Sequence, residues 1–302
     1  MIFPFFAGII LFSCKKSQAP QPHQTRSVSD TLMVYSQQTQ NGKSNILLKS
    51  FKTGETKTII NSGSYPFATN LRLVYIKSGN TLGFAKVDGI SNLLIPLTQP
   101  SEPTLSFDSR LVCVIDKLAD RYQLLKYDTS GNKTILYETT DEIASPSFSS
   151  DGQKIVFAQR TSVNSSALYL IPITGGTPKK VTTSVQDVYD QYPTITTATI
   201  YFVRSRIIDS TLSSEIFSSN FGGTSTTQLT NFTNDWTSPS FFIKDLRRVS
   251  NGIDTSSFVF VSNHDDNNNT DIYQYKLGGQ LKKMTQTAES ESFPSLIPNF
   301  EK

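Results

Sequence analysis

Six prolines recur along the chain at intervals of 37 to 55 residues, and most of them begin a similar stretch of sequence. They are Pro66, Pro103, Pro146, Pro193, Pro239 and Pro294. The stretch that follows contains a short apolar segment, a turn, a second apolar segment, a third with an aromatic or Leu centre, and a Gly turn. A four-strand unit repeated about every 40–50 residues is the sequence signature of a β-propeller. The repeat therefore predicts an all-β propeller of four-stranded antiparallel blades.

The clearest copy of the unit begins at Pro146. Asp151-Gly152 predicts a tight turn because Gly tolerates positive φ, residues 167–170 form a third strand, and Gly175-Gly176 leads into a last strand that ends at 181–182. At these residues the chain resembles the TolB-type propeller repeat. Other copies match its second half, at 215–217 with Leu229-Thr230, at 271–273 with Met284-Thr285, and at Leu97-Thr98. The resemblance implies a propeller over residues 30–302 and a partner-binding platform.

The two ends of the predicted propeller carry complementary fragments of the unit. The N-terminal end begins with strands of the second, third and fourth type at 31–36, 45–49 and 55–60, and the C-terminal end is a lone first strand at 292–297. Together they complete one sheet, which removes the open edge that a linear array would leave. Five whole units plus this composite predict six blades. Seven are expected if the unit opened by Pro239, which carries an insertion at 244–256, contains further strands.

The N-terminus is expected to act as a targeting segment. Residues 2–12 form an apolar run that is shorter than the roughly 20 residues needed to span a bilayer, as in a secretory signal. Ser13-Cys14 at its end resembles the lipobox of bacterial lipoproteins, which implies a signal peptide at 1–13 and lipidation at Cys14. Residues 14–29 are polar and read as a flexible tether. These features predict an envelope protein anchored to the outer membrane, periplasmic or surface-exposed; an ordinary signal peptide or an uncleaved apolar tail is the alternative.

The charge and the reactive side chains indicate no catalysis and no nucleic-acid binding. A net charge of +3 comes from scattered residues, and doublets such as Lys179-Lys180, Arg247-Arg248 and Lys282-Lys283 are interpreted as solvated strand edges. The two histidines, His23 and His264, fall in the tether and in a polar loop, so a zinc site or a Ser-His-Asp triad is not expected. We predict no catalytic residue and no cofactor.

Two further polar features have a structural and a chemical interpretation. Cys113 lies in a continuous apolar segment and is expected to be a buried structural thiol. Asp265 and Asp266 belong to an Asp/Asn-rich loop that offers oxygen ligands for calcium, but they lack the ligand spacing of known calcium loops. A polar turn is the favoured interpretation of this loop.

Acidic residues recur shortly before the prolines that begin the inner strands. They are Glu102, Glu142, Asp190, Asp235 and Glu291. In a propeller these positions are expected to fall on one rim of the central channel, where a ring of carboxylates could hold a cation or a basic segment of a partner. Tyr192 and Trp236 are expected near the same rim and would suit a peptide or glycan surface. The alternative is that each carboxylate accepts backbone N–H groups in its own turn.

The sequence favours a non-enzymatic scaffold that binds an envelope protein or a ligand as a monomeric propeller. One alternative is a carbohydrate-binding accessory of a nutrient-uptake system. A glycan-cleaving enzyme is a further alternative, because similar propellers cleave pectic oligosaccharides with a metal held by several histidines, which the predicted channel lacks. The peptidase relatives of the fold carry a C-terminal hydrolase domain that is not found within these 302 residues.

Overall fold

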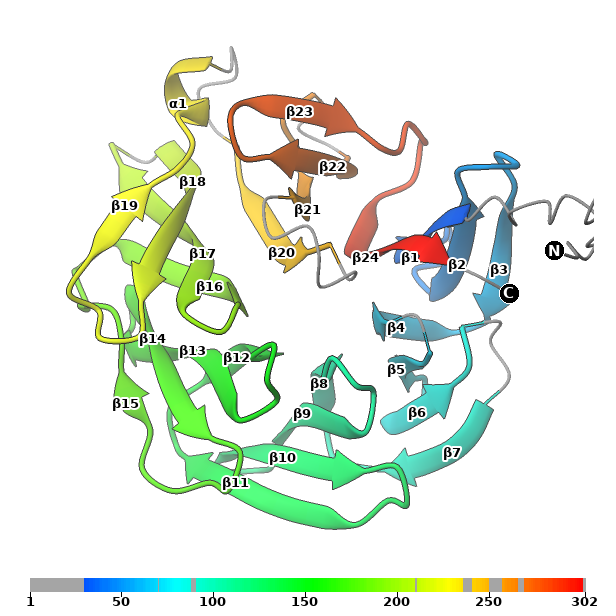
Figure 1. The fold of residues 1–302 in the computed structure, drawn as a ribbon, viewed down its shortest axis with the longest axis horizontal. Coiled ribbons are helices and arrows are strands. Elements are labelled where there is room, and N and C mark those ends of the chain that lie inside the picture. Colours follow the sequence, from blue (N-terminus) through cyan, green and yellow to red (C-terminus); the bar gives the residue numbers. More distant parts are fainter. Residues whose placement is uncertain are drawn as a thin grey trace, which may run out of the picture.

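The computed structural model describes residues 30–69, 71–87, 91–209, 211–235, 241–249, 257–265 and 269–300. Apart from the one-turn helix α1 (Phe232–Asp235), the secondary structure assigned in these residues is β-strand. The sheets are arranged in a ring around a common centre (Figure 1). The described residues contain no helix that could serve as a membrane span. The fold is an all-β propeller.

Four of the sheets contain four antiparallel strands each, in the orders β24-β1-β2-β3, β4-β5-β6-β7, β8-β9-β10-β11 and β20-β21-β22-β23. Their bounds are β1 (Asp30–Gln38), β2 (Ser44–Ser50), β3 (Thr56–Ile60), β4 (Gly63–Ala68), β5 (Leu73–Lys77), β6 (Thr81–Ala85), β7 (Ser91–Pro96), β8 (Pro100–Leu105), β9 (Leu111–Lys117), β10 (Tyr122–Asp128), β11 (Lys133–Thr139), β20 (Ile243–Arg248), β21 (Ser257–Ser262), β22 (Asp271–Lys276), β23 (Gln280–Lys283) and β24 (Glu291–Phe300).

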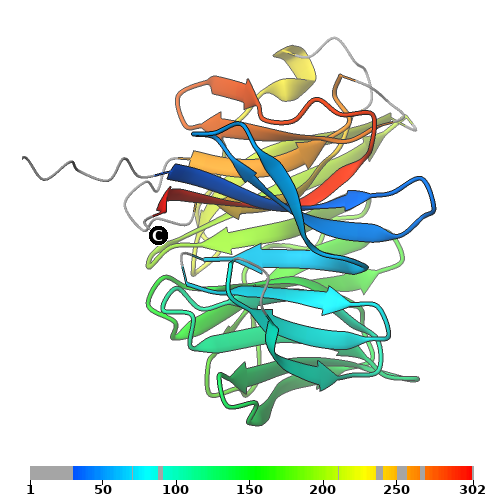
Figure 2. The same ribbon diagram turned by 90° about the vertical axis from the view of Figure 1, so that its right-hand side faces the viewer.

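The first and last strands of the propeller share a sheet. β24 pairs antiparallel with β1, with Leu32 opposite Ile297 and Met33 opposite Leu296. Figures 1 and 2 show the red C-terminal strand beside the blue N-terminal one. This is the pairing expected from the two complementary fragments, and it joins the first and last strands of the propeller through backbone hydrogen bonds.

The fifth sheet has eight strands and combines two successive units. Its strands are β12 (Ile143–Phe148), β13 (Lys154–Ser162), β14 (Ser165–Pro172), β15 (Lys179–Lys180), β16 (Val188–Ile195), β17 (Thr199–Ile208), β18 (Thr211–Asn220) and β19 (Thr226–Gln228). Only two residue pairs, Ser165 with Val188 and Ser166 with Tyr189, join β14 to β16, and they run parallel. Elsewhere in this sheet the neighbouring strands are antiparallel.

The hydrophobic core consists of separate clusters that lie between neighbouring four-strand units. Val156 and Leu168, from β13 and β14, pack in one cluster with Phe202 and Phe217 from β17 and β18. The two halves of the eight-stranded sheet therefore contact each other through apolar side chains. Five similar clusters connect the other neighbouring units around the ring. Stability thus depends on contacts between units as well as on pairing within them.

The recurring apolar-Thr pair ends each of three units with the same hydrogen bond. The hydroxyl of Thr182 accepts the backbone N–H of Leu168 at 3.0 Å. Thr230 and Thr285 accept the N–H of Ile216 and Ile272 at 2.9 Å in the same way. The outermost strand has ended at this point, so the threonine hydroxyl satisfies an N–H that would otherwise be buried without a partner.

The sixth unit begins later than the sequence analysis predicted. Its inner strand is β20, so residues 244–248 belong to that strand and not to an insertion between the first two strands. The register of β20 against β21 gives Leu246 the place that a proline holds in the other units. Pro239 lies outside the described residues. The prediction failed because the unit lacks the proline that marks the inner strand elsewhere.

Candidate functional site: the central cavity

Each inner strand contains a β-bulge that brings one residue toward the centre of the ring. In β12, Ala144 pairs with Ala158 and Ser147 with Val156, so Ser145 and Pro146 together stand opposite one residue. Proline is tolerated here because a bulged residue need not donate a backbone hydrogen bond to the neighbouring strand. The same shift occurs in β4, β8, β16, β20 and β24. The repeated prolines are therefore markers of the bulge.

The first residue of every bulge has a left-handed backbone, with φ between 49° and 55°. These residues are Tyr65, Glu102, Ser145, Tyr192, Asp245 and Phe293, here called the bulge ring. Side chains other than Gly pay about 1–2 kcal/mol each in this conformation. Backbone strain of this kind clusters at functional sites, so the bulge ring is a candidate site.

Two carboxylates of the bulge ring bind the backbone of the following inner strand. A carboxylate oxygen of Glu102 accepts the N–H of Ser145, and Oδ2 of Asp245 accepts the N–H of Phe293 at 3.0 Å. Burial raises the pKa of Glu102 to about 7, opposed by the Ser145 hydrogen bond and by the positive charge of Arg247. Burial also raises the pKa of Asp245. Each carboxylate therefore joins its own inner strand to the next one. The negative charge of Asp245 also adds to the rise in the pKa of Glu102.

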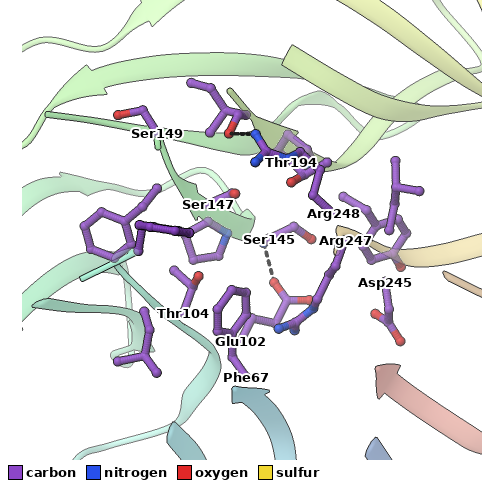
Figure 3. A pocket seen from close by; sticks show the side chains of 18 of the residues that line it. Phe67, Glu102, Thr104, Ser145, Ser147, Ser149, Thr194, Asp245, Arg247 and Arg248 are labelled. Atoms are coloured by element: carbon purple, nitrogen blue, oxygen red, sulfur yellow. Dashed lines mark hydrogen bonds between the residues drawn. The ribbon is translucent and has the colours of Figure 1, made fainter. Parts of the chain in front are cut away.

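Two residues beyond each bulge residue lies a second ring, in which hydroxyl side chains predominate. Its members are Phe67, Thr104, Ser147, Thr194, Arg247 and Ser295. The guanidinium carbon of Arg247, on β20, lies 4.6 Å from the centre of the Phe67 ring, on β4. The composite sheet that contains β24 stands between these two strands, so the Arg247 side chain reaches across the ring. Figure 3 shows Arg247 and Glu102 pointing toward each other.

The inner strands surround a cavity of about 100 Å³ that opens to solvent, here called the central cavity. Residues from β4, β8, β12, β16, β20 and β24 line it, from the bulge ring to the hairpins after β8 and β12, where Phe107 and Ser150 contribute. Since one water occupies about 30 Å³ of liquid, the space suits a few waters or one small chemical group.

Three buried side-chain atoms in this cavity have no hydrogen-bond partner among the described residues: Thr104 Oγ1, Arg247 Nη1 and Arg248 Nε. The Ser145 hydroxyl lies beside the Glu102 carboxylate and opposes the rise in its pKa that burial causes. A buried polar atom without a partner costs about 1–3 kcal/mol, so three around one space indicate a site that a ligand or water completes. Arg248 is otherwise anchored, because its Nη1 donates to Ile195 O at 3.1 Å and to Ser150 Oγ at 3.3 Å. Burial lowers the pKa of Arg247 to about 10.

The predicted acidic residues do not form one ring of free carboxylates. Glu102 lines the central cavity. Asp190 is fully buried and binds Arg204 through both oxygens, at 2.7 and 2.8 Å. Glu291 is also buried, and its Oε2 accepts the hydroxyl of Thr285 at 3.1 Å.

The other predicted rim residues are dispersed. Glu142 is about half exposed and lies 3.3 Å from Arg160, away from the cavity lining. Tyr192 belongs to the bulge ring and lines the cavity, and burial together with Asp245 and Glu102 raises its pKa well above the ordinary value. Asp235 is the last residue of α1, but its side chain and Trp236 lie outside what the structure describes. The sequence did not predict this dispersion, because the carboxylates lie at different numbers of residues from the bulge residue.

The remaining predicted residues fall elsewhere. Cys113 is fully buried as expected, and burial raises the pKa of its thiol. Asp265 accepts the Tyr273 hydroxyl at 2.7 Å and pairs with Lys283 at 2.8 Å, while Asp266 and Cys14 lie outside the described residues. In the part of the chain with described structure, no group of three or more His, Cys, Asp or Glu side chains is arranged to hold a metal ion.

The two arginines of the site were not predicted from the sequence. Arg247-Arg248 was interpreted as a solvated edge, whereas both line the central cavity. The signal that could have found them is the alignment of Asp245-Leu246 with Glu102-Pro103, which places Arg247 at the level of Thr104. Without the proline this alignment is visible only from the register of the strands.

No protein-family model matches the sequence, and no curated protein matches it either. Solved structures do match. TolB from Acinetobacter baumannii superposes with a TM-score of 0.64 at 13% identity, over 88% of this chain and 66% of that chain. The chain has a TolB-like β-propeller fold.

Other solved structures share the TolB-like fold under different names. Oligogalacturonate lyase in complex with manganese superposes with a TM-score of 0.57 at 14% identity, over 85% of this chain and 74% of that chain. Hydrazine synthase of Kuenenia stuttgartiensis gives 0.64 at 10% identity, over 90% of this chain and 47% of that one. At these identities the likeness shows the architecture alone.

Proposed function

We propose that this protein is a non-enzymatic binding propeller, lipid-anchored in a bacterial envelope, and that the central cavity receives part of its partner or ligand. The observation that carries the proposal is the set of three unpartnered polar atoms around the central cavity. The two carboxylates of the bulge ring are engaged with backbone N–H groups, which suits a structural and binding role for them.

We also propose that the propeller has six blades, with the eight-stranded sheet counted as two. This count is supported by the apolar cluster between its halves and by their connection through only two parallel residue pairs. Six bulges at equivalent places in six inner strands support it as well.

The proposed location rests on the sequence. The apolar run, the lipobox-like Ser13-Cys14 and the polar tether at 14–29 together favour a lipid-anchored envelope protein. Metabolic labelling with a palmitate analogue tests this part: the wild-type protein should incorporate label, and Cys14→Ser should abolish it. Equal labelling of both proteins would contradict the anchor.

Site-specific photo-cross-linking in intact cells tests the binding function. A photoreactive residue in place of Phe107, beside the cavity, should capture a partner or ligand that one in place of Thr134, exposed on the outer strand β11, does not capture. Arg247→Met should reduce the capture. Identical products from both positions, or none from position 107, would contradict binding at the cavity. Captured glycan instead of protein would favour the carbohydrate-binding alternative.

A further inference from the structure

The three unpartnered atoms of the central cavity can all donate a hydrogen bond. Arg247 Nη1 and Arg248 Nε can only donate, while the hydroxyl of Thr104 can donate or accept. A guanidinium does not lose its proton in a protein. The group that completes the site must therefore supply acceptor atoms, and a negatively charged acceptor makes the strongest bond to a guanidinium.

The charges around the cavity favour an anion with a single negative charge. Arg247 and Arg248 face Glu102 and Asp245 across the same space. Arg247 and Arg248 supply two positive charges, and Asp245 and Glu102 supply the negative charge already present. A ligand with one negative charge therefore leaves the site closer to neutral than a phosphate dianion would.

Phe107 is an exposed apolar side chain at the cavity. It lies on the β8–β9 hairpin, where its side chain is 54% exposed, and Leu71 on the neighbouring hairpin is 66% exposed. Thr69 Oγ1 and Ser109 Oγ, 2.6 Å apart, join these two hairpins. Leu105, Phe148, Ile195 and Val249 also line the cavity, but each is buried and packs in a different cluster between neighbouring units. A ligand that enters past Phe107 contacts apolar surface before it reaches the guanidiniums.

We propose that the central cavity binds the carboxylate of an apolar acid, the chemistry of the C-terminal residue of a polypeptide that ends in an apolar side chain. Arg247 and the hydroxyl of Thr104 hold the carboxylate, Arg248 supports it from the side, and Phe107 covers the apolar body. This assignment rests on the proposed binding function and specifies its ligand.

Calorimetric titration of the full-length protein with matched probes tests the assignment. N-acetyl-L-phenylalanine should bind, and N-acetyl-L-phenylalanine amide, which lacks the carboxylate, should bind at least tenfold more weakly. Phenyl phosphate probes a dianion on an apolar body, and galacturonate probes a carboxylate on a polar body; both should bind more weakly than the apolar acid. Arg247→Met should weaken binding of the acid about tenfold or more, which corresponds to the loss of a charged hydrogen bond.

Two further variants keep the test decisive. Arg110→Met is the matched control, because Arg110 is 82% exposed on the β8–β9 hairpin and should leave affinity unchanged. Arg247→Lys keeps the positive charge without the forked donor geometry, so it should bind the acid more weakly than wild type. This variant still tests the assignment if Arg247→Met fails to fold.

Several results would overturn the assignment. They are equal binding of the acid and its amide, tighter binding of phenyl phosphate or galacturonate, wild-type affinity in both Arg247 variants, or no binding of any probe. If cross-linking from position 107 succeeds while the carboxylate probes fail, the ligand assignment is wrong and the binding function stands. If both fail, the binding function is wrong as well.

Discussion

Asp190 and Glu142 form a matched pair for testing how the structure assigns its carboxylates. Both were predicted on one binding rim, but Asp190 is fully buried and holds Arg204 in a two-point ion pair at 2.7 and 2.8 Å. The Arg204 guanidinium also packs 4.9 Å from the centre of the Phe217 ring. Removing one partner of such a pair leaves a buried charge uncompensated, so Asp190→Ala should cost about 3–5 kcal/mol of unfolding free energy.

Glu142→Ala should change stability far less. The Glu142 and Arg160 side chains are 48% and 53% exposed and 3.3 Å apart, and exposed pairs of this kind contribute about 0–1 kcal/mol. Each kcal/mol shifts the melting temperature by about 2–4 °C for a domain near this size. Thermal unfolding followed by circular dichroism should therefore show a loss of roughly 6–20 °C for Asp190→Ala and at most about 4 °C for Glu142→Ala.

A double variant separates the ion pair from other effects of truncation. Asp190→Ala with Arg204→Ala should cost less than the sum of the two single changes, because no unpaired charge remains. Equal and small losses for Asp190→Ala and Glu142→Ala would refute the assignment of Asp190 to the structural ion pair.

Three further measurements test other parts of the structure. Because the folded protein raises the pKa of Glu102 from 4.5 to about 7, the stability this group contributes is present below about pH 4.5 and lost as pH rises through 7. Glu102→Gln should therefore gain melting temperature relative to wild type between pH 5 and pH 8, and a constant difference would contradict this. Thr182→Val should lose about 1–2 kcal/mol in urea unfolding because it removes the acceptor of Leu168 N–H, whereas the exposed Thr177→Val should be neutral. The Cys113 thiol should react with a maleimide only after unfolding, and modification of the native protein within minutes would show that the residue is not buried.

The architecture could be predicted from the sequence because its repeat has a physical cause. A proline at each β-bulge fits a place where the ladder needs no N–H, so Pro66, Pro103, Pro146, Pro193 and Pro294 mark the inner strands directly. The terminal pairing was predictable for the same reason, since the fragment around Pro294 could only be a first strand. The sixth unit was misplaced because Leu246 occupies the marked position there.

The cavity could be predicted only in part. Glu102 and Tyr192 were identified because they precede bulge prolines, but Asp190 and Glu291 stand two residues before the bulge residue, where they bind partners in their own surroundings. Arg247 could not be identified, since its place depends on the register of β20 and on a side chain that reaches across the ring. The repeat pattern of the sequence does not predict such contacts between distant units.

A crystal structure of the protein with bound N-acetyl-L-phenylalanine would show whether the central cavity binds an apolar acid. We expect the carboxylate within hydrogen-bond distance of Arg247 Nη1 and of the Thr104 hydroxyl, with the phenyl group toward Phe107. A ligand bound elsewhere on the propeller, or Arg247 Nη1 paired with Glu102 in a cavity closed to the ligand, would contradict it.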